Sequence, residues 1–325
     1  MVKVSPGNLR AFEKLGQKGS LFNYGLIDLI KENAEVKVLS ADLSLLSGLD
    51  RFIRKYPNHF IQTGIAEQNM MAIAAGYAME DHMSIATTYS SFIAVRSLEQ
   101  IRQNISNTCA NVKIIGTFAG VVAAKSGVSH WATEDLAFMR ALPNMTVLSP
   151  ADSLEAIKCF EAATKIDSPV YIRLSGGINC PMVFCDDYEY RIGKFVKLTD
   201  GDDVAIIATG LMVNESLKAS KMLSEKGIKA SVYDAHTIKP LDRNTLDEIF
   251  SRAKLIVTVE EHNVIGGLGS AVAEYKATKE NTPRQIFLGF NDKFTKSGSQ
   301  RFIWNSSNIT DEQICNRIVS ECAVM

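Results

Sequence analysis

Short apolar runs alternate along the chain with longer stretches in which apolar residues recur at helical spacing. In the first half, the apolar runs of strand length are Val36–Ser40, Met83–Thr87, Val112–Phe118, Thr146–Leu148 and Val170–Leu174. The stretches with helical spacing between them are Leu21–Glu32, Ala66–Met79, Phe92–Asn107, Glu134–Leu142 and Ser153–Thr164. This alternation predicts βαβ units and therefore a parallel sheet covered by helices.

A change of composition after Leu174 divides the pattern into two parts. The run Ser175–Pro181 and the polar run Asp186–Arg191 predict a linker. In the second α/β unit that follows, the predicted strands are Val204–Ala208, Lys229–Tyr233 and Leu255–Val259, and the predicted helices are Asn214–Glu225 and Arg243–Ala253. We therefore expect an α/β protein with a parallel-sheet domain at residues 1–180 and a smaller α/β domain at residues 190–325.

Two aspartates and a glycine cluster mark boundaries within these units. Asp152 and Asp242 each stand directly before a predicted helix, where a carboxylate accepts a hydrogen bond from a free backbone N–H group. The segment Glu260–Ser270 contains Gly266-x-x-Gly269, whose spacing is not that of a dinucleotide-binding motif. We expect a tight strand-to-helix turn there rather than a phosphate site.

The composition excludes several classes of function. Of the 325 residues 46% are hydrophobic and 22% are charged, with a net charge of -1, which gives no support for nucleic-acid binding. No secretory signal is evident, and no apolar run reaches the roughly 20 residues that a bilayer requires, so we expect a cytoplasmic protein without membrane contact. The six cysteines show no metal-ligand spacing, which predicts reduced thiols and no metal site in this chain.

The segment Thr63–Met70 carries the strongest candidate for chemistry. It places Glu67 where a short strand and turn lead into a helix of small residues. A carboxylate at a helix start is stabilised by the helix dipole and by free N–H groups. A carboxyl surrounded by alanine and isoleucine also retains a proton more readily than one in water. Both a structural and a catalytic role suit this position.

Several motifs, taken in order, resemble those of the C-terminal half of thiamine-diphosphate enzymes of the transketolase family. They are Val38–Ser44, Phe60–Met70, Thr87–Phe92, Leu98–Arg102, Ser129-His130, Glu134–Ala137, Arg140–Asn144 and Glu260–Ser270. The resemblance spans essentially the whole chain. It implies a pyrimidine-binding domain followed by the family's C-terminal domain.

One motif of the family is missing. The family holds the cofactor's diphosphate through a divalent metal bound by Gly-Asp-Gly and a later Asn, because the phosphate charges must be neutralised. The nearest match, Gly201-Asp202-Asp203, lies in the wrong domain. The resemblance therefore implies an N-terminal transketolase subunit that carries the diphosphate and its Mg²⁺ or Ca²⁺. The two chains would form an α2β2 heterotetramer with the cofactor across their interface.

The resemblance also assigns roles to individual residues. Glu67 matches the glutamate that shares a proton with N1′ of the cofactor's aminopyrimidine. Tyr89 and Phe92 match the aromatic residues against which that ring packs, and Asp42 matches an acid near the thiazolium. His130 matches a histidine that contacts the donor sugar and relays protons. The alternative for Tyr89 and Phe92 is a place in the core. For Asp42 it is a turn cap, and for His130 it is a structural role.

Ile65, inside the matched segment Phe60–Met70, and Arg96, in the predicted helix after Phe92, are further candidates for contact with the cofactor. For Arg96 we favour an ion pair with Glu99, three residues further along the helix. The other histidines match no motif. His59, His82 and His236 are expected at the surface or in loops, and His262 is expected to be structural.

The substrate positions depart from the pattern of transketolases that act on sugar phosphates. Phe118 replaces a histidine, Lys125-Ser126 an acidic pair, Leu45-Leu46 a Gly-Ser pair, Trp131 a glutamine, and Gly176 the arginine that binds phosphate. Loss of a bidentate arginine removes strong, orienting hydrogen bonds. Lys125 and Arg173 remain as candidate cations, although Arg173 falls within the predicted strand Val170–Leu174. We expect a drier, more aromatic pocket and an acceptor other than a common pentose or tetrose phosphate, for example a modified or nucleotide-linked sugar.

The resulting hypothesis is transfer of a two-carbon ketol unit from a ketose to an aldehyde or modified-sugar acceptor. Two alternatives stay open. The β subunit of a 2-oxoacid dehydrogenase shares the two-domain plan and would pass an acyl group to a lipoyl domain. A non-catalytic paralogue would keep the fold and use the altered pocket for assembly or regulation.

Overall fold

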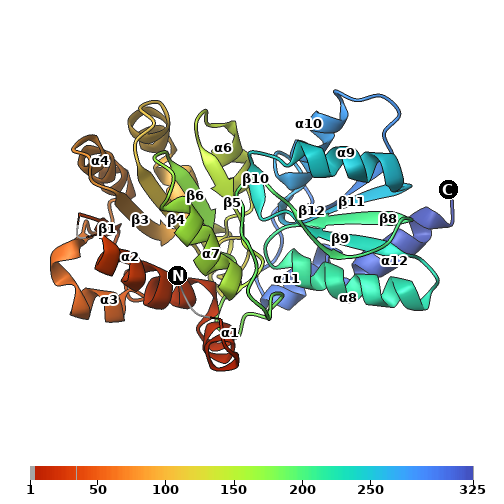
Figure 1. Cartoon of the computed structure of the whole chain (residues 1–325), viewed down its shortest axis with the longest axis horizontal. Helices are drawn as coiled ribbons and strands as arrows, with labels where there is room; N and C mark the ends of the chain where they lie inside the picture. The colour runs from red at the N-terminus through yellow and green to blue at the C-terminus, as the bar shows by residue number, and fades with distance from the viewer. Residues whose placement is uncertain (1–3, 34, 325) are drawn as a thin grey trace.

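A computed structural model describes residues 4–33 and 35–324, which form two α/β units side by side (Figure 1). The sheet of the first unit has the strand order β10-β5-β6-β4-β3-β1-β2. Its strands are β1 (Lys37–Ser40), β2 (Phe60–Gln62), β3 (Ser84–Tyr89), β4 (Val112–Thr117), β5 (Thr146–Leu148), β6 (Val170–Arg173) and β10 (Thr237–Lys239). All neighbours are parallel except β10, which runs antiparallel to β5. The predicted α/β fold with a parallel sheet is confirmed.

The second sheet has the order β12-β11-β8-β9-β7. Its strands are β7 (Val196–Thr199), β8 (Val204–Ala208), β9 (Ala230–Asp234), β11 (Leu255–Asn263) and β12 (Arg284–Phe290). Only β7 is antiparallel to its neighbour. The segment between β9 and β10 therefore leaves the second sheet and enters the edge of the first, so that the two units share a seam.

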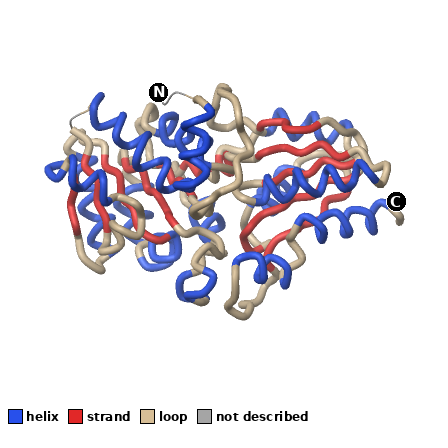
Figure 2. The backbone as a smooth tube through the Cα atoms, turned by 90° about the horizontal axis from the view of Figure 1, so that it is seen from below, coloured by secondary structure: helices blue, strands red, loops and turns tan. Residues whose placement is uncertain are grey.

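Helices cover both faces of each sheet, as Figures 1 and 2 show. In the first unit these are α1 (Pro6–Ser20), α2 (Leu26–Glu32), α3 (Asp50–Lys55), α4 (Glu67–Met79), α5 (Leu98–Gln100), α6 (Asp135–Ala141) and α7 (Ser153–Ala163). In the second they are α8 (Met212–Glu225), α9 (Arg243–Arg252), α10 (Leu268–Lys276), α11 (Gln300–Ser306) and α12 (Asp311–Cys322). Helices on both faces explain why β3, β4 and β6 are buried throughout.

The predicted elements agree with the structure where the apolar pattern was long. The predicted helix Phe92–Asn107 is instead divided at Ser97, with π-helical turns η3 (Phe92–Arg96) and η4 (Ile101–Ser106) on either side of α5. Asp152 and Asp242 both cap their helices, accepting from the N–H groups of Glu155 and Thr245.

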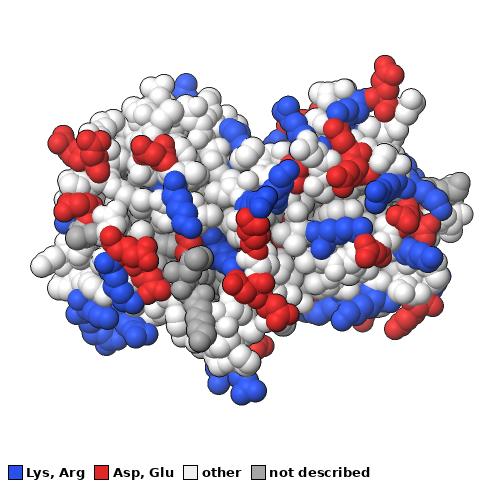
Figure 3. All heavy atoms as spheres, in the orientation of Figure 1, with Lys and Arg blue, Asp and Glu red and all other residues white. Residues whose placement is uncertain are grey.

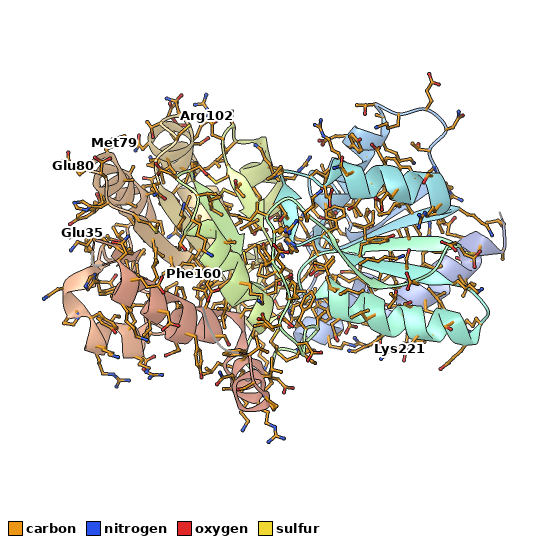
Figure 4. All side chains as sticks on the ribbon, viewed as in Figure 1. Glu35, Met79, Glu80, Arg102, Phe160 and Lys221 are labelled. Atoms are coloured by element: carbon orange, nitrogen blue, oxygen red, sulfur yellow. The ribbon has the colours of Figure 1, made fainter. Side chains whose placement is uncertain are left out.

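A small residue packs against a large one where the helical turn Leu21–Gly25 meets α7 in the first unit. The side chain of Phe160 is labelled in Figure 4. Its ring packs against Gly25, where a Cβ atom would lie 3.1 Å from Cδ1 of the ring. On the face of the molecule that Figure 3 shows, acidic and basic side chains are interspersed, without a large area of one sign. None of the helices in the described part of the chain is both long and apolar enough to cross a bilayer.

The structure also bears on the expectations for His236, for His262 and for the turn at Gly266–Gly269. His236 lies in the loop between β9 and β10, which agrees with the expected surface or loop position, but its side chain is fully buried at the seam between the sheets. His262 is buried and structural, with Nδ1 2.7 Å from the carbonyl of Asn263. At the expected turn, the N–H groups of Leu268 and Gly269 donate to the carboxylate of Glu260, so an acid fills the position that a phosphate would need.

Candidate active site

The predicted cofactor residues lie where strands β2, β1, β3 and β4 end on the same edge of the first sheet. Glu67 begins α4 just beyond β2, Asp42 follows β1, Phe92 follows β3, and Phe118 follows β4. Since β2, β1, β3 and β4 are parallel neighbours, their carboxyl ends bring these segments together. The left-handed backbone of Gly64, at φ +71°, turns the chain from β2 into α4.

The carboxyl group of Glu67 is buried but only half satisfied. Its side chain is 2% exposed, and its Oε1 accepts a 2.7 Å hydrogen bond from Nη1 of Arg96. Its Oε2 is buried and has no hydrogen-bond donor among the described residues. A buried acceptor without a donor is costly, so Oε2 suits a protonated ring nitrogen supplied by a ligand. The aminopyrimidine of thiamine diphosphate provides such a nitrogen, and the residues present therefore fit that half of the cofactor.

A row of aromatic rings leads away from this carboxyl group. The rings of Phe92 and Tyr89 are stacked, with centroids 5.7 Å apart and an interplanar angle of 12°. Tyr89 in turn packs on Phe118 with centroids 4.4 Å apart. The imidazole of His130 stands edge-on to Phe92 and Tyr89, at 5.4 Å and 6.1 Å. The structure thus brings together the predicted residues Tyr89, Phe92, Phe118 and His130, and flat heterocycles pack well on such surfaces.

The side chain of Arg96 reaches the carboxyl group directly. Its guanidinium lies 4.5 Å from the ring centroid of Phe92 while it donates to Glu67. The favoured pairing of Arg96 with Glu99 is therefore wrong, because Glu99 lies near Arg102 instead, at 4.0 Å. The break in the helix at Ser97 separates Arg96 from the helical register that the i, i+3 argument assumed.

Asp42 and Ile65 lie on the exposed rim. The backbone of Asp42 is left-handed, with φ of +63°, and its N–H donates to the side chain of Gln62 at 2.7 Å. Ile65 is 77% exposed in the turn before α4. Ile65, Leu45, Leu46 and Val95 are exposed apolar residues in the segments that follow the carboxyl ends of β2, β1 and β3, and the exposed Phe294 lines a groove together with Val95. We call these five side chains the apolar rim. Exposed apolar side chains gathered in one region are typical of a surface that another molecule covers.

A lysine that the sequence did not single out lies at the far end of the aromatic row. The Nζ atom of Lys18 is 3.8 Å from the centroid of the Phe118 ring, and it donates to the carbonyl of Leu46. Burial lowers the pKa of Lys18 to about 8. The pocket around Phe118 and Leu46 is therefore not simply dry and aromatic, since it contains an ammonium group stacked on a ring.

The glycines on either side explain the position of Lys18. Gly16 has φ of +70° within α1, and a Cβ atom there would lie 1.9 Å from the carbonyl oxygen of Gly177. Only glycine permits this close approach, which brings Gln17 and Lys18 against the site. The sequence signal was a lysine between Gly16 and Gly19 in an otherwise helical pattern.

The predicted substrate residue Gly176 and the candidate cation Arg173 do not face the site. Gly176 is buried behind Gln17, whose Oε1 accepts from its N–H at 2.6 Å, and a Cβ atom on Gly176 would lie 2.7 Å from Gln17. Arg173 is also withdrawn from substrate, because its Nε donates to both oxygens of Asp135, at 3.1 Å and 2.9 Å, inside the protein.

The remaining predicted substrate residues lie on the loop after β4. Ser126 and Lys125 are exposed, whereas Trp131 is buried with no hydrogen-bond partner for Nε1 among the described residues. Trp131, Phe92 and Arg96 line a groove of 440 Å³ together with Phe294 of the second unit. No cluster of three or more His, Cys, Asp and Glu side chains suited to a metal ion is found in residues 4–33 and 35–324.

Comparison with known proteins agrees with this arrangement. Residues 19–178 match the pyrimidine-binding domain of transketolases, and residues 193–314 match the transketolase C-terminal domain. The chain is 38% identical over 309 residues to a Methanocaldococcus jannaschii protein provisionally named as a transketolase C-terminal section, which covers 94% of this chain and 96% of that one. It is 35% identical over 295 residues to a 6-deoxy-6-sulfo-D-fructose transketolase subunit of a Clostridium species, covering 89% and 90%.

A solved structure shows the same similarity in three dimensions. It is a split-gene transketolase described as an inactive β4 tetramer, 38% identical to this chain, with a TM-score of 0.86 over 94% of this chain and 98% of that one. These matches extend over nearly the full length of each relative. The chain belongs to the transketolase family and carries its pyrimidine-binding domain followed by its C-terminal domain.

Proposed function

We propose that this chain is the C-terminal subunit of a two-subunit, thiamine-diphosphate-dependent enzyme that transfers a two-carbon ketol unit between sugars. The observation that carries the proposal is the buried, unpartnered Oε2 of Glu67 beside the stacked rings of Tyr89 and Phe92. A carboxyl oxygen and an aromatic platform are the two features that an aminopyrimidine requires from this domain.

Each site residue of this chain would have a separate role in cofactor binding or proton transfer. Oε2 of Glu67 would share a proton with the ring nitrogen, and Arg96 would keep the other carboxyl oxygen in place. Phe92 would pack against the ring, and the edge-on His130 would exchange protons with substrate oxygens. When bound, thiamine diphosphate supplies the nucleophilic carbon that accepts the two-carbon unit.

The remaining half of the cofactor site is assigned to a partner. No metal cluster occurs in the described residues, whereas a diphosphate needs Mg²⁺ or Ca²⁺ beside it. The apolar rim offers a surface for an N-terminal transketolase subunit, and we propose an α2β2 assembly. That the β4 relative is inactive agrees with a requirement for the second subunit.

The position of Lys18 narrows the class of substrate that we propose. Its ammonium group lies over Phe118 beside the loop of Leu46, where a sugar with an anionic group would find a counter-charge. The Clostridium relative is named for a sulfo-sugar, which carries such a group. We therefore propose a sugar with an anionic substituent as a substrate. The buried Gly176, in place of the family's phosphate-binding arginine, favours an acceptor other than a common pentose or tetrose phosphate.

The test is co-expression of this chain with its N-terminal partner, followed by assays of ketol transfer over a panel of ketose donors and sugar acceptors. Glu67→Gln should fold and assemble normally but lose at least roughly 100-fold in turnover, because general acid–base catalysis commonly contributes that much. Glu99→Gln, at an exposed position nearby, is the control. Reductive acylation of lipoamide instead of ketol transfer would assign the chain to the 2-oxoacid dehydrogenases. Near-normal turnover of Glu67→Gln would refute the proposal.

A further inference from the structure

The loop between β4 and α6 carries Phe118, the predicted substrate residue Ser126, and His130. Its base is closed by two hydrogen bonds of 2.9 Å between the backbones of Gly120 and Ala132. The imidazole of His130 therefore stands on a closed segment, and its position depends on what holds residues 119–133.

Residues of the second unit hold both sides of this loop. The contacts come from the end of β11, at Glu261, His262 and Asn263. Oε1 of Glu261 accepts from the N–H of Val121 at 3.3 Å, where the chain leaves the first sheet. The N–H of Asn263 donates to the carbonyl of Thr133 at 2.8 Å, where the chain returns. Nε2 of His262 accepts from the N–H of Ala137 in α6 at 3.4 Å.

Glu261 is the centre of these contacts. Its side chain is 1% exposed, and two donors from α11 reach the same Oε1 that accepts from Val121. They are Nε1 of Trp304 at 2.7 Å and Nε2 of Gln300 at 2.9 Å. We call Glu261, Gln300 and Trp304 the β11 clamp. Because a buried donor without an acceptor is costly, loss of this one oxygen would leave each of these donors unsatisfied.

Close packing leaves the base of the loop little room to shift. At Gly120, where φ is +62°, a Cβ atom would lie 2.2 Å from Oε2 of Glu261. Nη2 of Arg173 donates to the backbone carbonyl of Glu261 at 2.9 Å and to that of Ala132 at 3.1 Å. The buried Trp131 belongs to the same apolar core as the strands and helices of the second unit.

We propose that Glu261 is a positioning residue that acts through His130. The β11 clamp fixes residues 119–133, and these hold the imidazole edge-on to Phe92, with centroids 5.4 Å apart. None of the predicted cofactor residues lies in the second unit, yet this unit thereby sets where protons are exchanged with substrate. The role of His130 rests on the proposed function, whereas the clamp itself does not.

Hydrogen–deuterium exchange on the full chain tests the clamp. Glu261→Met keeps much of the side-chain length but removes the acceptor oxygen, so exchange in residues 119–133 should rise about tenfold relative to β8. Glu261→Gln keeps an acceptor oxygen and should retain most of the protection. Glu321→Met is the matched control, because it removes another buried carboxylate of the second unit, paired with Arg284 and Arg317. It should leave residues 119–133 unchanged.

A double-mutant cycle in the co-expressed two-subunit enzyme tests the route through His130. Glu261→Met should lower kcat/KM for ketol transfer by roughly 10- to 100-fold, because a displacement of about 1 Å can cost that much. In a His130→Ala background the same change should cost no more than about twofold, since the group that is positioned is already gone. Glu261→Gln should restore most of the activity, and Glu321→Met should keep it.

Equal losses of kcat/KM from Glu261→Met with and without His130 would overturn the proposal. Exchange of the Val121 amide in the unaltered chain as fast as that of the exposed Lys125 would also overturn it, and that measurement needs no variant to fold. Absence of ketol transfer in the unaltered enzyme would refute the proposed function and with it the role of His130. Failure of the exchange test alone would refute the clamp and leave the proposed function standing.

Discussion

Nη1 of Arg96 lies 2.7 Å from Oε1 of Glu67, although 29 residues separate the two along the chain. The pair leaves one oxygen of the carboxyl group engaged and the other without a donor. It also places a cation beside an acid that has to share a proton. Arg96 therefore both orients the carboxyl group of Glu67 and places a positive charge beside it, so its replacement tests the cofactor site directly.

Replacement of Arg96 by Leu should weaken cofactor binding in the two-subunit enzyme. Without the guanidinium, Oε1 of Glu67 is buried without a partner and the carboxyl group is free to turn, so we expect a rise of about tenfold in the dissociation constant. Arg96→Lys should recover part of the loss. Fluorescence titration with thiamine diphosphate measures the effect, and equal affinity in all three proteins would contradict it.

Lys18→Met should change substrate preference rather than assembly. Methionine keeps the apolar stem that packs near Phe118 but removes the charge. We expect the KM for acceptors with a phosphate or sulfonate group to rise about tenfold, and the KM for neutral acceptors to stay unchanged. Lys18→Arg is the control that keeps the charge. An equal effect on charged and neutral acceptors would show that Lys18 does not read the anion.

The same lysine predicts a pH dependence. Because burial lowers the pKa of Lys18 to about 8, its ammonium loses its proton as the pH rises through that value. The KM for an anionic acceptor should therefore increase above about pH 8, and kcat should respond less. Lys18→Arg, which stays charged, should flatten the KM profile. A profile that Lys18→Arg leaves unchanged would assign the titration to another group.

Arg173 and Asp135 form a buried ion pair whose loss should destabilise the fold. Nε of Arg173 lies 2.9 Å from Oδ2 of Asp135, and both side chains are fully buried. Asp135→Leu leaves the guanidinium without its counter-charge and should cost about 3–5 kcal/mol in urea denaturation. Asp50→Ala, which removes the exposed Arg54–Asp50 pair, should stay within about 0.5 kcal/mol. An equal loss of unfolding free energy in Asp135→Leu and Asp50→Ala would show that the buried ion pair stabilises the fold no more than the exposed pair does.

Gly176→Arg tests whether the family's phosphate arginine can be restored. A Cβ atom alone at this position would lie 2.7 Å from the Gln17 side chain and from the Cys180 sulfur. We expect a loss of stability of about 1–3 kcal/mol and no gain in phosphate recognition. A stable variant with improved turnover of sugar phosphates would mean that Gln17 moves aside.

Much of the fold followed from periodicity, because long apolar runs in a parallel sheet are buried on both faces. Strands such as β4 and β8 and helices such as α7 agree with their predicted ranges within about two residues. The short strand β10 could not be found in this way. It contains only Thr237–Lys239, and its partner β5 lies almost a hundred residues earlier in the chain.

The sequence by itself determined the family, the α/β class and the segments that meet at the site, because ordered motifs and strand ends are local properties of the chain. Only the tertiary structure decided which side chains interact there. Arg96 pairs with Glu67 and not with Glu99, Lys18 lies over Phe118, and Arg173 pairs with Asp135. Each of these contacts joins residues far apart in sequence, and its energy depends on burial and on neighbours that no local pattern records.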